Sequence, residues 1–217
     1  MKQSCYGTYR EKSMKGLLLR AMVFFRLGLL PVIYVLMLLV VFILPLFSVE
    51  EYSILKNTTS HLGAQGAPNA WVMNVVFALL GIAAAFDSWK RLSNYWLHKI
   101  LIVVFGASLF LTAFFQHAPI VPDAAFSRQE DDMHSILATV TGFSFTFFAI
   151  ACAFIETAKT RKLIAAGVGL LSLLLSVLIF NVAVLAGVWQ RIIFIGAFAW
   201  LMYFLYRRNS LLVTHQP

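Results

Sequence analysis

Six long apolar runs dominate the sequence and constrain its fold more than any other feature. The runs cover residues 27–48, 71–88, 97–117, 135–156, 163–185 and 189–206. A helix rises about 1.5 Å per residue, so about 20 residues cross the ~30 Å hydrocarbon core of a bilayer. The runs do not alternate apolar and polar residues as membrane barrel strands would. The sequence therefore predicts an all-α polytopic membrane protein with six transmembrane helices in one bundle.

The composition agrees with this interpretation. Hydrophobic residues make up 61% of the chain and charged residues 12%, whereas a soluble domain carries about 25% charged residues. These values exclude an ordinary soluble domain and a disordered chain. The first run is too long for the core of a cleavable signal peptide, which has about 7–15 residues, so we expect it to be retained as a membrane helix.

The charges are distributed unequally between the two predicted sides of the membrane. One side holds most of the 17 Lys and Arg residues but only Glu11, Asp87 and Glu156 of the 9 acids. Because Lys and Arg in short loops remain on the cytoplasmic side, both termini are predicted to be cytoplasmic, in a bacterial inner membrane. The positive charge is spread over several segments, which predicts contact with membrane lipid and no nucleic-acid partner.

The predicted organisation has three parts. Residues 1–26 form a basic cytoplasmic or interfacial N-terminal segment, residues 27–206 form the six-helix transmembrane domain, and residues 207–217 form a basic cytoplasmic tail. On the outer side, two connections are long, at 49–70 and 118–134. Long loops in compact proteins commonly carry function, so the outer face is where we expect the functional site.

Three histidines, His61, His117 and His134, fall on this outer side. His117 ends the third apolar run and His134 precedes the fourth, so we expect these two to approach each other across adjacent helices. Imidazole and carboxylate groups are suitable ligands for zinc or iron. A divalent-metal or acid–base site made by the three histidines and one aspartate is therefore one interpretation. In the other interpretation, Asp131 and Asp132 only cap the following helix and complement its dipole.

Two further polar residues, Asn181 and Arg191, flank the last outer hairpin. An arginine within the hydrocarbon costs at least about 2.5 kcal/mol without compensation. We therefore expect Arg191 to face the bundle and to pair with an outer-loop acid or an anionic ligand. The complete set of candidate ligand-binding residues is His61, His117, Asp131, Asp132, His134, Asn181 and Arg191.

Three fragments together suggest a family. They are NTTSHLG at 57–63, the Asp/His approach to the fourth run ending at His134, and GVWQR at 187–191 with Trp200. Over about residues 27–206 the chain resembles the six-helix prokaryotic membrane family catalogued as domain of unknown function 998. In that family the first motif usually reads Ile-Ser-Asp-Leu-Gly and the last ends in Glu-Arg; here His61 and Gln190 replace the two acids. The resemblance implies a six-helix bundle with its polar motifs on the outer face.

The leading functional hypothesis is a non-enzymatic membrane protein that binds a lipid headgroup or small solute in an outward-facing polar pocket. One alternative is an outer-face, metal-assisted lipid hydrolase or transferase, and another is a small-solute transporter. The chain contains no P-loop and no GxGxxG motif, and no pair of histidines lies deep within two runs, so no nucleotide or haem is expected.

Overall fold

The computed structural model describes residues 28–92, 94–121 and 123–213. Within these ranges every regular element is a helix. The predicted N-terminal segment, residues 1–26, lies outside the described residues. The long helices are α2 (Leu30–Ile43), α3 (Ala70–Arg91), α4 (Trp96–Leu111), α5 (Arg128–Ile155), α6 (Lys159–Asn181) and α7 (Ala186–Val213). The short 3₁₀ helices are η1 (Leu44–Phe47), η2 (Thr59–Gly63) and η3 (Ala183–Leu185).

The prediction of an all-α fold with long apolar helices is confirmed. Among the described residues, five helical segments, counting α2 together with η1, are long and apolar enough to cross a membrane. The exception is α4, whose 16 residues extend only about 24 Å. The crossing count of six and the cytoplasmic location of the termini stay predictions.

Helix boundaries differ most from those predicted at the start of α5, at the end of α4 and at the end of α7, which continues to Val213 beyond the predicted end at 206. The fourth long helix, α5, begins at Arg128 because the Ser127 hydroxyl accepts a hydrogen bond from the Glu130 backbone N–H and so caps the helix. The first turn also contains Glu130 and Asp131, which suit the positive end of the helix dipole. Hydrophobicity alone missed this polar beginning. The helix α4 ends at Leu111, and the chain turns at Thr112, whose hydroxyl donates to the Leu109 carbonyl oxygen at 2.7 Å.

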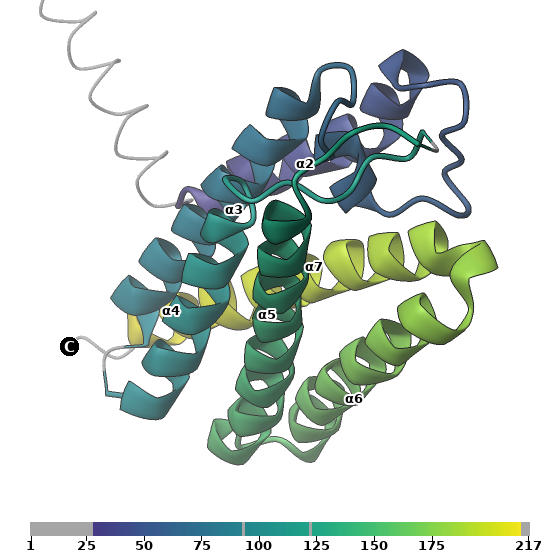
Figure 1. Ribbon diagram of the computed structural model, residues 1–217. Coiled ribbons are helices and arrows are strands. Elements are labelled where there is room, and N and C mark those ends of the chain that lie inside the picture. The colour runs from purple at the N-terminus through teal and green to yellow at the C-terminus, as the bar shows by residue number, and fades with distance from the viewer. Residues whose placement is uncertain (1–27, 93, 122, 214–217) are drawn as a thin grey trace, which may run out of the picture.

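Consecutive helices pack against each other, and α7 closes the bundle by also contacting α2 and α3. In Figure 1, α5 and α6 meet at their short connection, residues 156–158, and diverge toward their other ends. Aromatic side chains fill the centre of the bundle, where Phe198 of α7 contacts Phe105 of α4, and Trp200 contacts Phe145 and Phe148 of α5.

The bundle has two distinct ends. The long-loop end carries the first loop (48–69), the second loop (112–127) and the short connection through η3. The basic end carries the connections 92–95 and 156–158. Two buried acids stabilise the basic end: Asp87 accepts hydrogen bonds from the Leu30 N–H and the Tyr206 hydroxyl, and Glu156 pairs with Arg161 and Arg207.

Candidate functional site

The first loop folds over the long-loop end of the bundle through η2. At the start of η2 the Thr58 and His61 side chains form a capping box, with the Thr58 hydroxyl 2.8 Å from His61 Nδ1. At its end the Asn74 side chain of α3 donates to the Gly63 carbonyl oxygen at 3.2 Å. These contacts hold η2 against the bundle.

Arg191 attaches the first loop to α7. Its side chain is buried, with 4% of the residue exposed. Nη1 donates to the carbonyl oxygens of Ile54, Asn57 and Gly187 at 3.0–3.1 Å, and Nη2 donates to the Tyr52 hydroxyl at 2.6 Å. Arg191 therefore faces the bundle as predicted. Among the described residues, however, its partners are carbonyl oxygens and a phenol in place of the predicted acid.

The Tyr52 phenol does not supply the missing negative charge. Burial raises the pKa of Tyr52, and this effect outweighs the opposite influence of the Arg191 charge and hydrogen bond. The phenol is therefore neutral at pH 7. Arg191 is held by oriented dipoles of the loop and of its own helix, which engage Nη1 and Nη2. Among the described residues, its buried Nε has no hydrogen-bond partner. This arrangement indicates a positioning role for Arg191 in the first loop.

The three predicted histidines come together from η2, the second loop and α5. The ring centroids of His61 and His117 are 4.5 Å apart, and those of His117 and His134 are 5.3 Å apart. The expected approach of His117 to His134 is thus confirmed. We call these three rings the histidine stack. It joins the two long loops to the start of α5.

The rings of the histidine stack are directed toward protein partners. His61 Nδ1 contacts Thr58, His117 Nδ1 lies 3.2 Å from the Ala118 carbonyl oxygen, and His134 Nδ1 donates to the Phe115 carbonyl oxygen at 2.7 Å. The rings contact one another by their faces and edges instead of pointing at one common centre. Within the described parts of the chain, no group of three or more His, Cys, Asp or Glu side chains is arranged to hold a metal ion.

Burial, together with the neighbouring His117 and His134, lowers the pKa of His61 to about 4, although Asp131 acts in the opposite direction. His61 is therefore neutral at pH 7. A neutral ring can pack against another imidazole without charge repulsion, which is consistent with the close contact to His117.

The remaining predicted site residues fall into two groups. Asp131 belongs to the stack region, where its Oδ1 accepts from the Ala118 N–H at 2.7 Å and lies 3.4 Å from His117 Nδ1. Asp132 is exposed at the next position of α5. Asn181 is exposed at the end of α6 and donates to the Val177 carbonyl oxygen of its own helix. The structure thus brings neither Asp132 nor Asn181 into the histidine stack.

A cavity of about 320 Å³ lies below η2, between α4, α5, α6 and α7. Most of its lining side chains are apolar, with Phe prominent among them. Ser60, Gln190 and His134 form part of the lining near the long-loop end. Among the described residues that line it, none is Lys, Arg, Asp or Glu.

The cavity reaches the apolar outer surface of the bundle between α5 and α6. Two of its lining residues, Phe143 of α5 and Phe180 of α6, are 50% and 80% exposed. Part of the cavity wall therefore belongs to the outer surface of the bundle.

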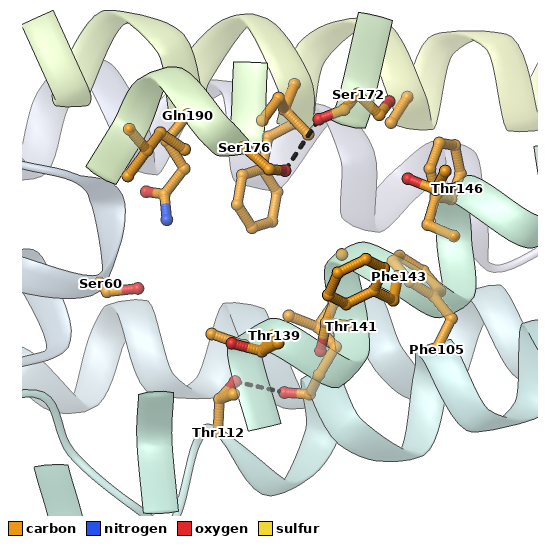
Figure 2. Close-up of a pocket in the computed structure, with 18 of the residues that line it drawn as sticks. Ser60, Phe105, Thr112, Thr139, Thr141, Phe143, Thr146, Ser172, Ser176 and Gln190 are labelled. Carbon is orange, nitrogen blue, oxygen red and sulfur yellow. Dashed lines mark hydrogen bonds between the residues drawn. The ribbon is translucent and has the colours of Figure 1, made fainter. Parts of the chain in front are cut away.

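Gln190, on the first turns of α7, connects the first loop to this cavity. Its Oε1 accepts from both the Thr59 N–H and the Thr59 hydroxyl at 2.6 Å. Figure 2 shows the amide nitrogen of Gln190 directed into the cavity and the Ser60 hydroxyl pointing into it from the opposite loop. Sequence reasoning noted Gln190 only as a departure from a family motif and did not include Gln190, Thr59 or Ser60 in the site. The signal was present: Gln190 adjoins Arg191, and the other two lie in NTTSHLG.

The family model described as "Protein of unknown function (DUF998)" matches residues 32–207. The chain belongs to the DUF998 family. This confirms the resemblance drawn from the three sequence fragments. The matched region of this DUF998 protein includes η2, the histidine stack, Gln190 and Arg191. No curated protein and no solved structure matches the chain.

Proposed function

We propose that this DUF998 protein binds one membrane lipid in the cavity between α4, α5, α6 and α7. The single observation that carries the proposal is the cavity itself, which has apolar walls, a polar end beneath η2 and an open side at the apolar outer surface. Ligand sites in proteins typically have volumes of about 300–1,000 Å³ and apolar walls with a few placed polar groups. The cavity of about 320 Å³ is in this range.

The chemistry of the walls favours a lipid over a polar solute. A polar solute needs hydrogen-bond partners over most of its surface, because an unpaired polar group in apolar surroundings costs free energy. Here the aromatic and aliphatic walls suit a hydrocarbon chain, and Gln190 and Ser60 suit a polar group at one end of that chain. Access between Phe143 and Phe180 allows the lipid to enter sideways from the bilayer.

A matched pair of glycine substitutions tests this function. Gly142 lines the cavity, and a Cβ there meets only the Ser176 hydroxyl, at 3.7 Å. Gly167 on α6 has open space around it and lies outside the cavity lining. We expect native mass spectrometry to show one co-purified lipid molecule per chain in the parent protein and none in Gly142→Phe. The control Gly167→Phe should retain it, and equal lipid retention by the two variants would refute the proposal.

The proposed topology is that of a multi-pass protein in a bacterial inner membrane, with both termini cytoplasmic and the long-loop end outward. The distribution of Lys and Arg supports this orientation. A cysteine at the exposed Ala125 of the second loop, in a Cys5→Ser background, should react with a membrane-impermeant reagent in intact cells. A reporter enzyme that works only in the cytoplasm should be active when it is fused after Pro217. The reverse pattern would overturn the orientation.

The position of His134 favours a second candidate, a lipid hydrolase or transferase that acts at the outer face. His134 belongs to both the stack and the cavity lining, so an imidazole lies beside the proposed lipid. The test is to incubate the protein with labelled lipid and search for cleaved or transferred products by mass spectrometry. Turnover that His134→Gln abolishes would support the enzyme, and unchanged lipid would support binding alone.

A transporter receives less support from the described residues. The buried acids Asp87 and Glu156 lie at the basic end of the bundle, and both are engaged in contacts that join helix ends. Neither acid lines the cavity.

A further inference from the structure

We propose that the lipid in the cavity is uncharged at its buried polar end and presents a hydrogen-bond acceptor oxygen, such as an ester carbonyl or a hydroxyl, to the Gln190 amide. This inference rests on the proposed function and specifies its ligand. It follows from the fixed orientation of Gln190, the engagement of the neighbouring hydroxyls and the absence of ionic side chains from the cavity lining.

The orientation of the Gln190 amide is determined by Thr59. A backbone N–H can only donate, so the Gln190 atom that lies 2.6 Å from Thr59 N must be the oxygen. The Thr59 hydroxyl donates to the same oxygen. The Gln190 nitrogen is therefore turned to the other side, into the cavity (Figure 2). This nitrogen has two N–H groups and no acceptor capacity, so the ligand atom that faces it must be an acceptor.

Most hydroxyls of the cavity wall are already engaged in their own helices. Thr112, Thr139, Thr141 and Ser176 each donate to a backbone carbonyl oxygen of the same helix. The Ser60 hydroxyl points into the cavity (Figure 2) and can donate to the same ligand oxygen or accept from a ligand hydroxyl. Gln190 and Ser60 therefore form the polar end of the site.

Among the described residues, the lining provides no positive charge to balance an anionic group. It contains no Lys or Arg, and Arg191, which follows Gln190, uses both of its terminal nitrogens for the first loop and α7. His134 directs its Nδ1–H to the Phe115 carbonyl oxygen. A phosphate or carboxylate buried here would have no counter-charge, which is strongly unfavourable in apolar surroundings. The same argument excludes a buried ammonium, because no acid lines the cavity.

A chain-matched ligand series tests the inference. The protein in detergent is titrated with four radiolabelled compounds that share a sixteen-carbon chain: hexadecane, 1-hexadecanol, methyl palmitate and palmitate at pH 8.5. We expect the alcohol and the ester to bind about tenfold more tightly than the alkane, the change given by one hydrogen bond. Palmitate, which is ionised, should bind more weakly than the ester. Diacylglycerol and a long-chain quinone then distinguish an ester source of the carbonyl from a quinone source.

Substitutions at Gln190 connect the preference to this residue. Gln190→Glu keeps an oxygen for Thr59 but replaces the amide nitrogen with a second oxygen, and Gln190→Met removes both groups. Both variants should lower ester affinity about tenfold and leave alkane affinity unchanged. The matched control is Asn181→Asp, an amide-to-acid change at an exposed position outside the cavity, which should bind like the parent.

Three results would overturn the inference. They are equal binding of ester and alkane, palmitate as the tightest ligand, or an unchanged ester preference in both Gln190 variants. Failure of all four compounds to bind the parent protein would instead overturn the proposed function, and this inference with it.

Discussion

Replacing Arg191 with alanine should release the first loop from α7. The substitution removes the three hydrogen bonds that reach the loop, to Ile54, Asn57 and Tyr52. The Asn57 carbonyl oxygen still accepts from the Tyr52 hydroxyl at 3.3 Å, whereas the Ile54 carbonyl oxygen loses its Arg191 donor. A hydrogen bond to a charged group contributes about 1.5–3 kcal/mol, and a neutral one about 1 kcal/mol. Removing the buried guanidinium also relieves its desolvation cost. We therefore expect a net loss of about 3 kcal/mol.

This loss can be measured at two levels. If the loss destabilises the whole bundle, the melting temperature in detergent should fall by about 6–12 °C. This range follows from about 2–4 °C per kcal/mol for a chain of this size. If only the loop opens, amide hydrogen exchange of residues 52–63 should accelerate about a hundredfold while the helices remain protected. Arg191→Lys should lose about half as much, since one ammonium cannot reproduce the guanidinium's fork. If Arg191→Ala unfolds and exchanges like the parent protein, Arg191 does not hold the first loop against α7.

Three further predictions concern helix packing and pH. A Cβ on Gly81 of α3 or Gly106 of α4 would collide with the backbone of the other helix. Alanine at either position should therefore lower the free energy of unfolding by about 1–3 kcal/mol. The control Gly167→Ala, which lies in open space, should be neutral or slightly stabilising. Because the pKa of His61 is about 4 in the folded state against an ordinary 6.5, stability should fall as pH decreases from 6.5 toward 4, and a parent-like pH slope in His61→Gln would contradict this. Burial alone would raise the pKa of Glu156, but its contacts with Arg161 and Arg207 outweigh burial and lower the pKa. The stability that ionised Glu156 gives to the fold should therefore be present at neutral pH and lost in acid. Glu156→Gln should make the melting temperature less dependent on pH in the acid range.

The helices could be predicted from the sequence because each one contains a long, continuous apolar run. The bundle and the family followed from the six runs and three motifs. The start of α5 could not be predicted in this way, because its first turns are polar and are stabilised by the Ser127 cap. The burial of Arg191 was predictable from the cost of a charge in hydrocarbon. Its partners were not, because they are backbone carbonyl oxygens, which carry no signature in the sequence.

The candidate site was predicted only in part. Loop connectivity correctly suggested that His117 and His134 approach each other, since a single connection joins their helices. The cavity could not be predicted, because it depends on how α5 and α6 diverge and on which side chains leave space between them. Gln190 gained its role only through the contact with Thr59, which is distant in the sequence and close in the fold.

Photo-crosslinking tests the central claim, that a lipid occupies this cavity, most directly. A lipid with a diazirine in its acyl chain is added to membranes that contain the protein, irradiated, and the labelled peptides are mapped by mass spectrometry. We predict that labelling concentrates on cavity-lining residues such as Phe143 and Phe180, and that Gly142→Phe reduces it there while labelling of Leu39 and Phe154, exposed elsewhere on the bundle, is unchanged. Labelling spread evenly over all these residues, and insensitive to Gly142→Phe, would contradict the account.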